Sequence, residues 1–222
     1  MDRQVGQHDL HENVHMIAAG NLASDRAIVN RISTAMQSRM VHLQIQLDPK
    51  MWAKWASGNN IDHRVTSFID FRPDLLHAFD PDHNDFTFPC ARTWEFVSKI
   101  IKNETVVDRS LAPDITGAIG PGAGLEFISF CSIYKELPTI KDILKDPTKV
   151  NVSDEPSVLF AITGMLANEA DPNTFDKLME YVLRMPMEFQ VITMQRAFMR
   201  NPTIATCQSW EDWLDSRADD VM

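Results

Sequence analysis

The chain contains few of the residues that mark secreted, zinc-binding or membrane proteins. Its three cysteines, Cys90, Cys131 and Cys207, are odd in number and far apart in the sequence. This pattern disfavours a disulfide framework and a zinc knuckle, and it predicts reduced, buried thiols. No apolar run approaches the roughly 20 residues that a membrane span requires, and the polar residues 1–4 are unlike a signal peptide. The sequence therefore predicts a soluble, cytoplasmic protein with no membrane partner.

Basic residues are also scarce. The chain has 21 Lys and Arg against 31 Asp and Glu, which gives a formal net charge of −10. Proteins that bind nucleic-acid backbones depend on clustered Lys and Arg that displace counterions, so general nucleic-acid binding is disfavoured. Hydrophobic residues make up 44% of the 222 residues. They are enough for a buried core in one large or two small domains.

The sequence lacks the phosphate-binding loop of P-loop enzymes. That loop reads G-x-x-x-x-G-K-[ST], and a separate apolar strand ending in acidic residues holds magnesium. Gly117 and Gly122 have the spacing of the two glycines, but Ala123 stands where the lysine belongs and no apolar strand precedes them. We therefore interpret 117–124 as a flexible loop leading into the next helix.

A strand, a helix and a second strand are predicted near the amino terminus. A short apolar run over 14–19 stops at Gly20 and Asn21, a polar helix-like segment follows to Arg39, and 41–47 alternates strictly between apolar and polar residues. A continuous apolar run is typical of a strand buried on both faces, and an alternating run of a strand with one covered face. Two strands joined by a helix imply a parallel sheet, with ligand chemistry at the carboxyl ends where Asn21 lies.

The remainder of the chain is predicted to be helical. Asp48 followed by Pro49 is typical of a helix start, and Trp94, Val97 and Ile101 form an apolar stripe on a helix over about 91–102. Four later segments have apolar residues at three- and four-residue spacing, which indicates amphipathic helices. These segments are 125–134, 156–166, 175–183 and 189–198.

Three segments, 16–21, 25–27 and 35–40, in this order resemble the second half of a AAA+ ATPase core of the MoxR-like kind found in phages and bacteria. Segment 88–95 resembles the second sensor of the same family, an arginine that opens a lid helix. The resemblance implies the end of a parallel α/β core over 1–47, a helical lid over 48–110 and a helical bundle over 111–222.

The same resemblance implies an activity and three site residues. A complete relative would bind ATP with magnesium between the subunits of a ring, hydrolyse it, and use lid motion to remodel a partner protein. Asn21 would sense the γ-phosphate, Arg39 would act as an arginine finger across the interface, and Arg92 would contact nucleotide from the lid. Because the phosphate loop is absent, the resemblance makes this chain a fragment or a short product that binds ATP very weakly by itself.

Each of these residues also has an ordinary structural explanation. An amide offers a donor and an acceptor to a phosphate and a water, but Asn21 after Gly20 also suits a turn. A guanidinium can stabilise a transferring phosphoryl group, whereas Arg39 also suits the negative end of a helix dipole. Arg92 lies at the positive end of its helix, where an anionic ligand or an ion pair with Glu95 would explain it.

Two functions from other classes stay open. One is a helical interaction module that binds no nucleotide, with Trp52, Trp55, Trp210 and Trp213 in its core or interface. The other is a zinc metallopeptidase, because 11–15 reads H-E-x-x-H, which on a helix sets two imidazoles on one face. A third ligand is missing from its expected place, since no glutamate follows Glu12 before Glu95.

Overall fold

The computed structural model describes residues 4–21, 32–82 and 84–216. Contacts between residues divide the chain into two units, Met1–Gln46 with Asp80–His83, and Leu47–Phe79 with Asn84–Met222. We refer to them as unit 1 and unit 2. The further division predicted at residue 110 stays a prediction.

Unit 1 contains little regular structure in its described residues. Strands β1 (Gln4–Val5) and β2 (His8–Asp9) form an antiparallel hairpin in which Gln4 pairs with Asp9. Gly6 turns this hairpin with a positive φ of 64°, a conformation that glycine adopts without steric cost. Helix α1 (Thr34–Gln37) is a single turn that begins at Ser33, whose hydroxyl accepts a hydrogen bond from the Met36 amide.

The described residues of 1–47 contain no parallel sheet, so the parallel sheet predicted there is wrong. Segments 14–19 and 41–47 form no strand, and Ile17, Leu43 and Ile45 are 94%, 87% and 95% exposed. A strand is stabilised by hydrogen bonds to a neighbouring strand, and in the described part of unit 1 the two strands β1 and β2 pair only with each other. Of the helix predicted to end near Arg39, only α1 is helical, and 22–31 lies outside the described residues.

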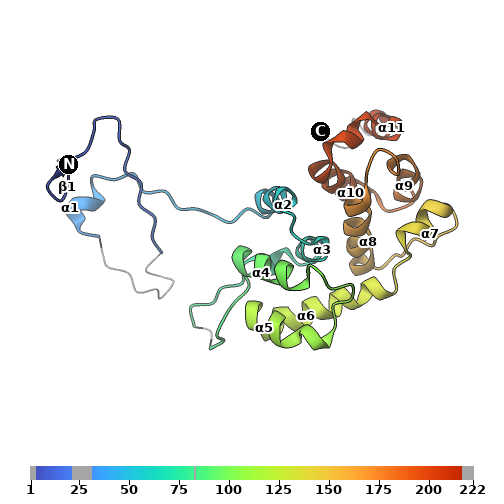
Figure 1. Cartoon of the computed structure of the whole chain (residues 1–222), viewed down its shortest axis with the longest axis horizontal. Coiled ribbons are helices and arrows are strands. Elements are labelled where there is room, and N and C mark those ends of the chain that lie inside the picture. Colours follow the sequence, from blue (N-terminus) through green and yellow to red (C-terminus); the bar gives the residue numbers. More distant parts are fainter. Residues whose placement is uncertain (1–3, 22–31, 83, 217–222) are drawn as a thin grey trace. The chain divides into compact units, whose positions relative to one another are not determined.

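Unit 2 is built from helices (Figure 1). The α-helices are α2 (Pro49–Gly58), α3 (His63–Phe71), α4 (Ala91–Ile101), α5 (Ala112–Ile119), α6 (Pro121–Ser132), α7 (Ile140–Lys145), α8 (Pro156–Glu169), α9 (Phe175–Val182), α10 (Met187–Arg200) and α11 (Gln208–Ser216). The short 3₁₀ helices are η2 (Pro73–Leu76), η3 (Arg109–Leu111), η4 (Ile133–Lys135) and η5 (Pro202–Thr206). No helix in the described ranges is long and apolar enough to cross a membrane.

Local sequence rules account for many of the helix boundaries. Asp48 caps α2 by accepting hydrogen bonds from the amides of Lys50 and Met51, with Pro49 at the first helical position. Helix α4 spans Ala91–Ile101, so the helix predicted over about 91–102 is confirmed. The four later amphipathic segments correspond to α6, α8, α9 and α10.

The flexible loop predicted over 117–124 is wrong. Helix α5 continues to Ile119 and α6 begins at Pro121, so only Gly120 separates two helices. Gly120 has a φ of 84°, which a residue with a side chain rarely adopts, and it turns the chain within one residue. Proline at the first position of α6 loses no helical hydrogen bond. The glycines of this segment therefore serve a turn between two helices.

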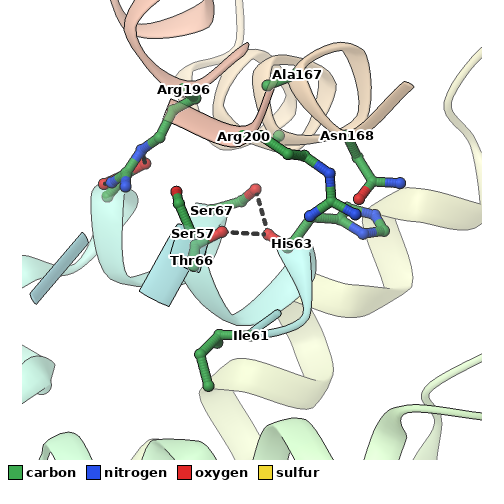
Figure 2. A pocket seen from close by; sticks show the side chains of 11 residues that line it. Ser57, Ile61, His63, Thr66, Ser67, Ala167, Asn168, Arg196 and Arg200 are labelled. Carbon is green, nitrogen blue, oxygen red and sulfur yellow. Dashed lines mark hydrogen bonds and ion pairs between the residues drawn. The ribbon is translucent and has the colours of Figure 1, made fainter. Parts of the chain in front are cut away.

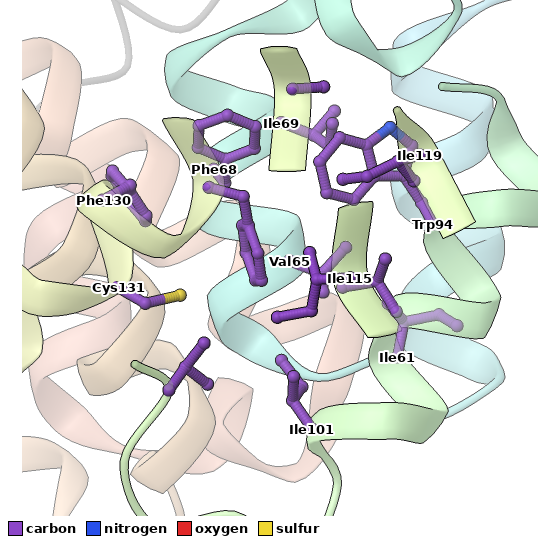
Figure 3. Close-up of a cluster of buried hydrophobic side chains, with 14 of the residues drawn as sticks. Ile61, Val65, Phe68, Ile69, Trp94, Ile101, Ile115, Ile119, Phe130 and Cys131 are labelled. Carbon is purple, nitrogen blue, oxygen red and sulfur yellow. The ribbon is translucent and has the colours of Figure 1, made fainter. Parts of the chain in front are cut away.

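The first hydrophobic core of unit 2 is aromatic at its centre (Figure 3). Phe68 of α3 is fully buried, and its ring centroid lies 5.4 Å from those of Trp94 and Phe127. Edge-on and tilted contacts between aromatic rings stabilise a protein by more than the burial of their apolar area alone. The indole nitrogen of Trp94 donates to the Leu75 carbonyl at 2.7 Å, so this buried donor has a partner.

A buried ion pair joins α3 to the end of α4. Arg64 donates to both carboxylate oxygens of Asp62, at 2.9 and 2.7 Å, and to the carbonyls of Ile101 and Glu104. Burial would raise the pKa of Asp62, but the hydrogen bonds and charge of Arg64 outweigh burial and lower it. Asp62 is therefore ionised, and Arg64 adds hydrogen bonds to one carbonyl in the last residue of α4 and one just after the helix.

Helix α8 packs against both α3 and α10. Ala161 belongs to the first core, whereas Ile162 and Leu166 belong to a second core with α9, α10 and α11. The approach of α8 to α3 depends on Gly164, because a Cβ there would lie 1.7 Å from the Ser67 hydroxyl oxygen. Only glycine therefore fits at this crossing.

Two glycine substitutions test this packing. Gly164→Ala should destabilise unit 2 by about 1–3 kcal/mol, because an added Cβ forces the two helices apart. Gly117→Ala, inside α5 with no atom within 4 Å of the added Cβ, should stabilise it by about 0.5–1 kcal/mol. Urea unfolding followed by circular dichroism measures both free energies of unfolding.

The double substitution Gly164→Ala with Ser67→Ala removes the clashing hydroxyl oxygen and should recover part of the lost stability. Equal stability of Gly164→Ala and the wild type would contradict the account.

Candidate functional site

Asn21 does not lie at the end of a strand. It is exposed and follows Gly20 in a segment of unit 1 without regular structure. The chain continues from Leu22 to Arg31 outside the described residues, and the competing arginines Arg26 and Arg31 lie there too. The geometry that would direct an amide at a phosphate requires a parallel sheet, and the sheet in the described part of unit 1 is the antiparallel pair of β1 and β2.

Arg39 lies in the turn after α1 and is exposed. Its Nη1 donates to the carbonyl of Ala35, four residues earlier. The side chain thereby provides a partner for a carbonyl at the end of its own helix, which is the arrangement that the helix dipole favours. An arginine finger would have to exchange this local contact for a phosphate.

Arg92 occupies the second position of α4 and is exposed. The expected partner Glu95 instead accepts from Lys99 at 2.6 Å, one turn further along the helix. Arg92 forms no ion pair with any residue of the described ranges. It therefore places an unneutralised positive charge at the positive end of α4, where an anion would be stabilised. Asn21 and Arg39 belong to unit 1 and Arg92 to unit 2.

The H-E-x-x-H segment is not helical. His11 begins a turn in which its carbonyl accepts from the Val14 amide at 3.0 Å and its Nδ1 accepts from the Asn13 amide at 3.2 Å. His11 and His15 therefore do not share a helix face, which is the geometry that a zinc peptidase uses. Within residues 4–21, 32–82 and 84–216, no three His, Cys, Asp or Glu side chains are grouped to hold a metal ion.

A cavity of about 30 Å³ lies in unit 2 among α2, α3, α8 and α10 (Figure 2). Most of its lining residues have polar side chains. The lining residues are Ser57, Ile61, His63, Thr66, Ser67, Asp70, Gly164, Ala167, Asn168, Arg196 and Arg200. Sequence reasoning missed this site, because its members come from four helices and match no motif. The one sequence feature that indicates it is the pair Arg196 and Arg200, one turn apart on α10.

Burial shifts the pKa values of two groups that line this cavity. Burial raises the pKa of Asp70 above its usual value, against the opposing charge and hydrogen bonds of Arg196, whose Nε donates to Asp70 at 3.0 Å. Burial lowers the pKa of His63, although the neighbouring Asp62 opposes this shift. His63 is therefore mainly neutral at pH 7, and the fixed positive charges of the cavity are the two arginines.

A second cavity, of about 290 Å³, lies beside the α5–α6 junction. It is lined by Asp85, Phe86, Thr87, Pro113, Thr116, Gly117, Gly120 and Pro121. Thr87 bridges its wall by donating to the Ala118 carbonyl at 2.8 Å. The lining holds one carboxylate and no cation, so nothing in it favours a phosphate. Asn21, Arg39 and Arg92 line neither cavity.

The chain matches no protein-family model, no curated protein and no solved structure.

The geometry of 11–15 generates a prediction about zinc. The purified protein should contain no stoichiometric zinc, because the two imidazoles do not share a helix face and a third ligand is lacking. Elemental analysis after dialysis measures the metal content. One zinc per chain that is lost in His11→Ala and retained in the control His42→Ala, also in unit 1, would establish the metallopeptidase reading instead.

Proposed function

We propose that this chain supplies the C-terminal part of a AAA+ ATPase of the MoxR-like kind: a helical lid, and a segment, 41–47, that would join a sheet built from further polypeptide. The complete enzyme binds ATP with magnesium between the subunits of a ring and uses hydrolysis to remodel a partner protein. The single observation that carries the proposal is the exposed apolar face of segment 41–47.

Segment 41–47 has the alternating side-chain pattern of a strand, and its apolar side chains are as exposed as those of a strand without a neighbour. Val41, Leu43 and Ile45 alternate with His42 and Gln44, and all three apolar side chains are exposed. Burying such side chains stabilises a protein by about 1.5–3 kcal/mol each, and alternation directs them to one face of a sheet. A sheet whose other strands come from polypeptide beyond these 222 residues would cover them and would pair the backbone.

The second support is the charge of Arg92. An exposed cation in the first turn of α4 without a described ion-pair partner fits a lid residue that contacts nucleotide phosphates. Asn21 after the apolar run 14–19 would sense the γ-phosphate once that run is paired in the sheet. Arg39 would reach the nucleotide of the neighbouring subunit from the end of the following helix.

This chain lacks the residues that supply most phosphate affinity. Neither the lysine of a phosphate loop nor a magnesium-binding carboxylate at a strand end occurs in the sequence. The isolated chain is therefore a partner in ATP hydrolysis without being an ATPase by itself. The phosphate loop would come from the same polypeptide that supplies the remaining strands.

A helical interaction module that binds no nucleotide is the second candidate. Met51 and Trp55 lie one turn apart on α2, and both are exposed, whereas Trp52 and Trp213 are buried in the cores. An exposed tryptophan beside an exposed methionine is typical of a protein-binding surface. DNA upstream of the Met1 codon separates the two candidates, since only the ATPase requires an in-frame G-x-x-x-x-G-K-[ST].

Substitutions in the complete ATPase test the proposed roles. Arg39→Ala should leave ATP binding and ring assembly nearly intact and lower kcat by roughly 10³-fold or more, because an arginine finger acts on the transition state of the neighbouring subunit. Arg92→Ala should weaken ATP binding as well, since it contacts nucleotide of its own subunit. Phosphate release and calorimetric titration with ATP measure these effects.

Lys50→Ala serves as the matched control, because Lys50 is an exposed cation near Arg39 in sequence with no assigned role. Mixing Arg39→Ala subunits with subunits disabled in their phosphate loop should restore part of the activity, since some interfaces then join an intact loop to an intact Arg39. Normal hydrolysis by an assembled Arg39→Ala ring would show that Arg39 is only a helix-end charge.

A further inference from the structure

The cavity among α2, α3, α8 and α10 is positively charged in a chain whose formal net charge is −10. Two arginines, Arg196 and Arg200, line it together with one carboxylate, Asp70. The two arginines are one turn apart on α10, where like charges repel and destabilise a helix. Asp70 offsets this repulsion in part through its ion pair with Arg196, and an anion bound between the two arginines would offset the rest.

Arg196 has hydrogen-bonding capacity that its ion pair does not use. Asp70 accepts from its Nε and Nη2, whereas its Nη1 is buried and has no hydrogen-bond partner among the described residues. A buried donor without a partner costs free energy, more so when the group is charged, and a bound ion or water commonly explains it. The Nη1 of Arg196 is therefore an available donor for a water or for a ligand that accepts hydrogen bonds.

Arg200 has no ion-pair partner in the described part of the chain. Figure 2 shows its guanidinium reaching from α10 towards the ring of His63, beside the amide of Asn168. Glu169, which follows Asn168 on α8, accepts from the Asn168 amide at 2.9 Å. Arg200 lies in the last turn of α10, where the helix dipole favours a cation. The dipole does not, however, supply a hydrogen-bond acceptor for the guanidinium group of Arg200 or of Arg196.

We infer that this cavity binds a small oxyanion, a phosphate or carboxylate group, through the guanidinium groups of Arg200 and Arg196. The hydroxyl of Ser57, which makes no hydrogen bond to a described residue, lines the same cavity and can donate to the anion. Charge-assisted hydrogen bonds from guanidinium to oxyanion are among the strongest that proteins form. The volume of about 30 Å³ is on the scale of a single small group.

This site is independent of the proposed ATPase. None of Asn21, Arg39 and Arg92 lines the cavity, and its residues come entirely from unit 2. Because α3, α8 and α10 all contribute to the lining, an anion here would hold these helices together. Binding should therefore appear as an increase in the thermal stability of the chain.

Titration of the full chain with sodium phosphate tests the site. Thermal unfolding at constant ionic strength, with sodium chloride as the reference salt, should show a saturable rise of Tm in phosphate, and calorimetry should give the matching Kd. Arg200→Gln should raise Kd by about tenfold or more, since it removes a charge-assisted hydrogen bond. Arg109→Gln, which removes an exposed cation elsewhere in unit 2, should leave the Kd unchanged.

Two further measurements make the result decisive. The imidazole proton resonances of His63 should shift on phosphate addition in the wild type and not in Arg200→Gln, which places the anion in this cavity. Sodium acetate, titrated in the same way, distinguishes a carboxylate site from a phosphate site. The inference is overturned if neither anion raises Tm more than chloride does, or if Arg200→Gln binds as tightly as the wild type.

Discussion

The backbone hydrogen bonds of a strand come from another strand, and this requirement determines which part of the chain folds. A helix pairs its own backbone groups within four residues, so unit 2 can form from local segments and bury two cores. Segment 41–47 has the side-chain pattern of a strand, but it has no neighbour to pair with in the described part of the chain. Its apolar side chains are consequently exposed, and the residues that depend on a sheet for their position, Asn21 and Arg39, are not brought to a common site.

Packing within unit 2 depends on a few close contacts. Helix α8 reaches α3 because residue 164 is glycine, and it contributes to both hydrophobic cores. Arg64 fixes the end of α4 against the start of α3 through Asp62 and two carbonyls. These contacts bring α3, α8 and α10 together around a small cavity, so the positive site is a consequence of how the helices cross.

The sequence predicted local features well and non-local features poorly. Helix α4 was predictable because its stripe, with Trp94 and Val97, lies within one segment. The separation of α5 and α6 at Gly120 was missed because a segment rich in glycine also suits a loop. The cavity was not predictable, since His63 and Arg196 are distant in sequence and meet only through the packing of α8 against both of their helices. Arg92 was located correctly at a helix start, because that depends on local capping alone.

Hydrogen exchange tests most directly the claim that 41–47 has the side-chain pattern of a strand but no neighbouring strand to pair with. In the isolated chain, the amides of 41–47 should exchange as fast as those of an unfolded peptide, while amides of α3 and α8 are protected. In the assembly that we propose, with further polypeptide that supplies a phosphate loop and the neighbouring strands, the amides of 41–47 should become protected, because each would then pair with a neighbouring strand. Protection of 41–47 in the isolated chain, or continued rapid exchange in the proposed ATPase assembly, would contradict the account.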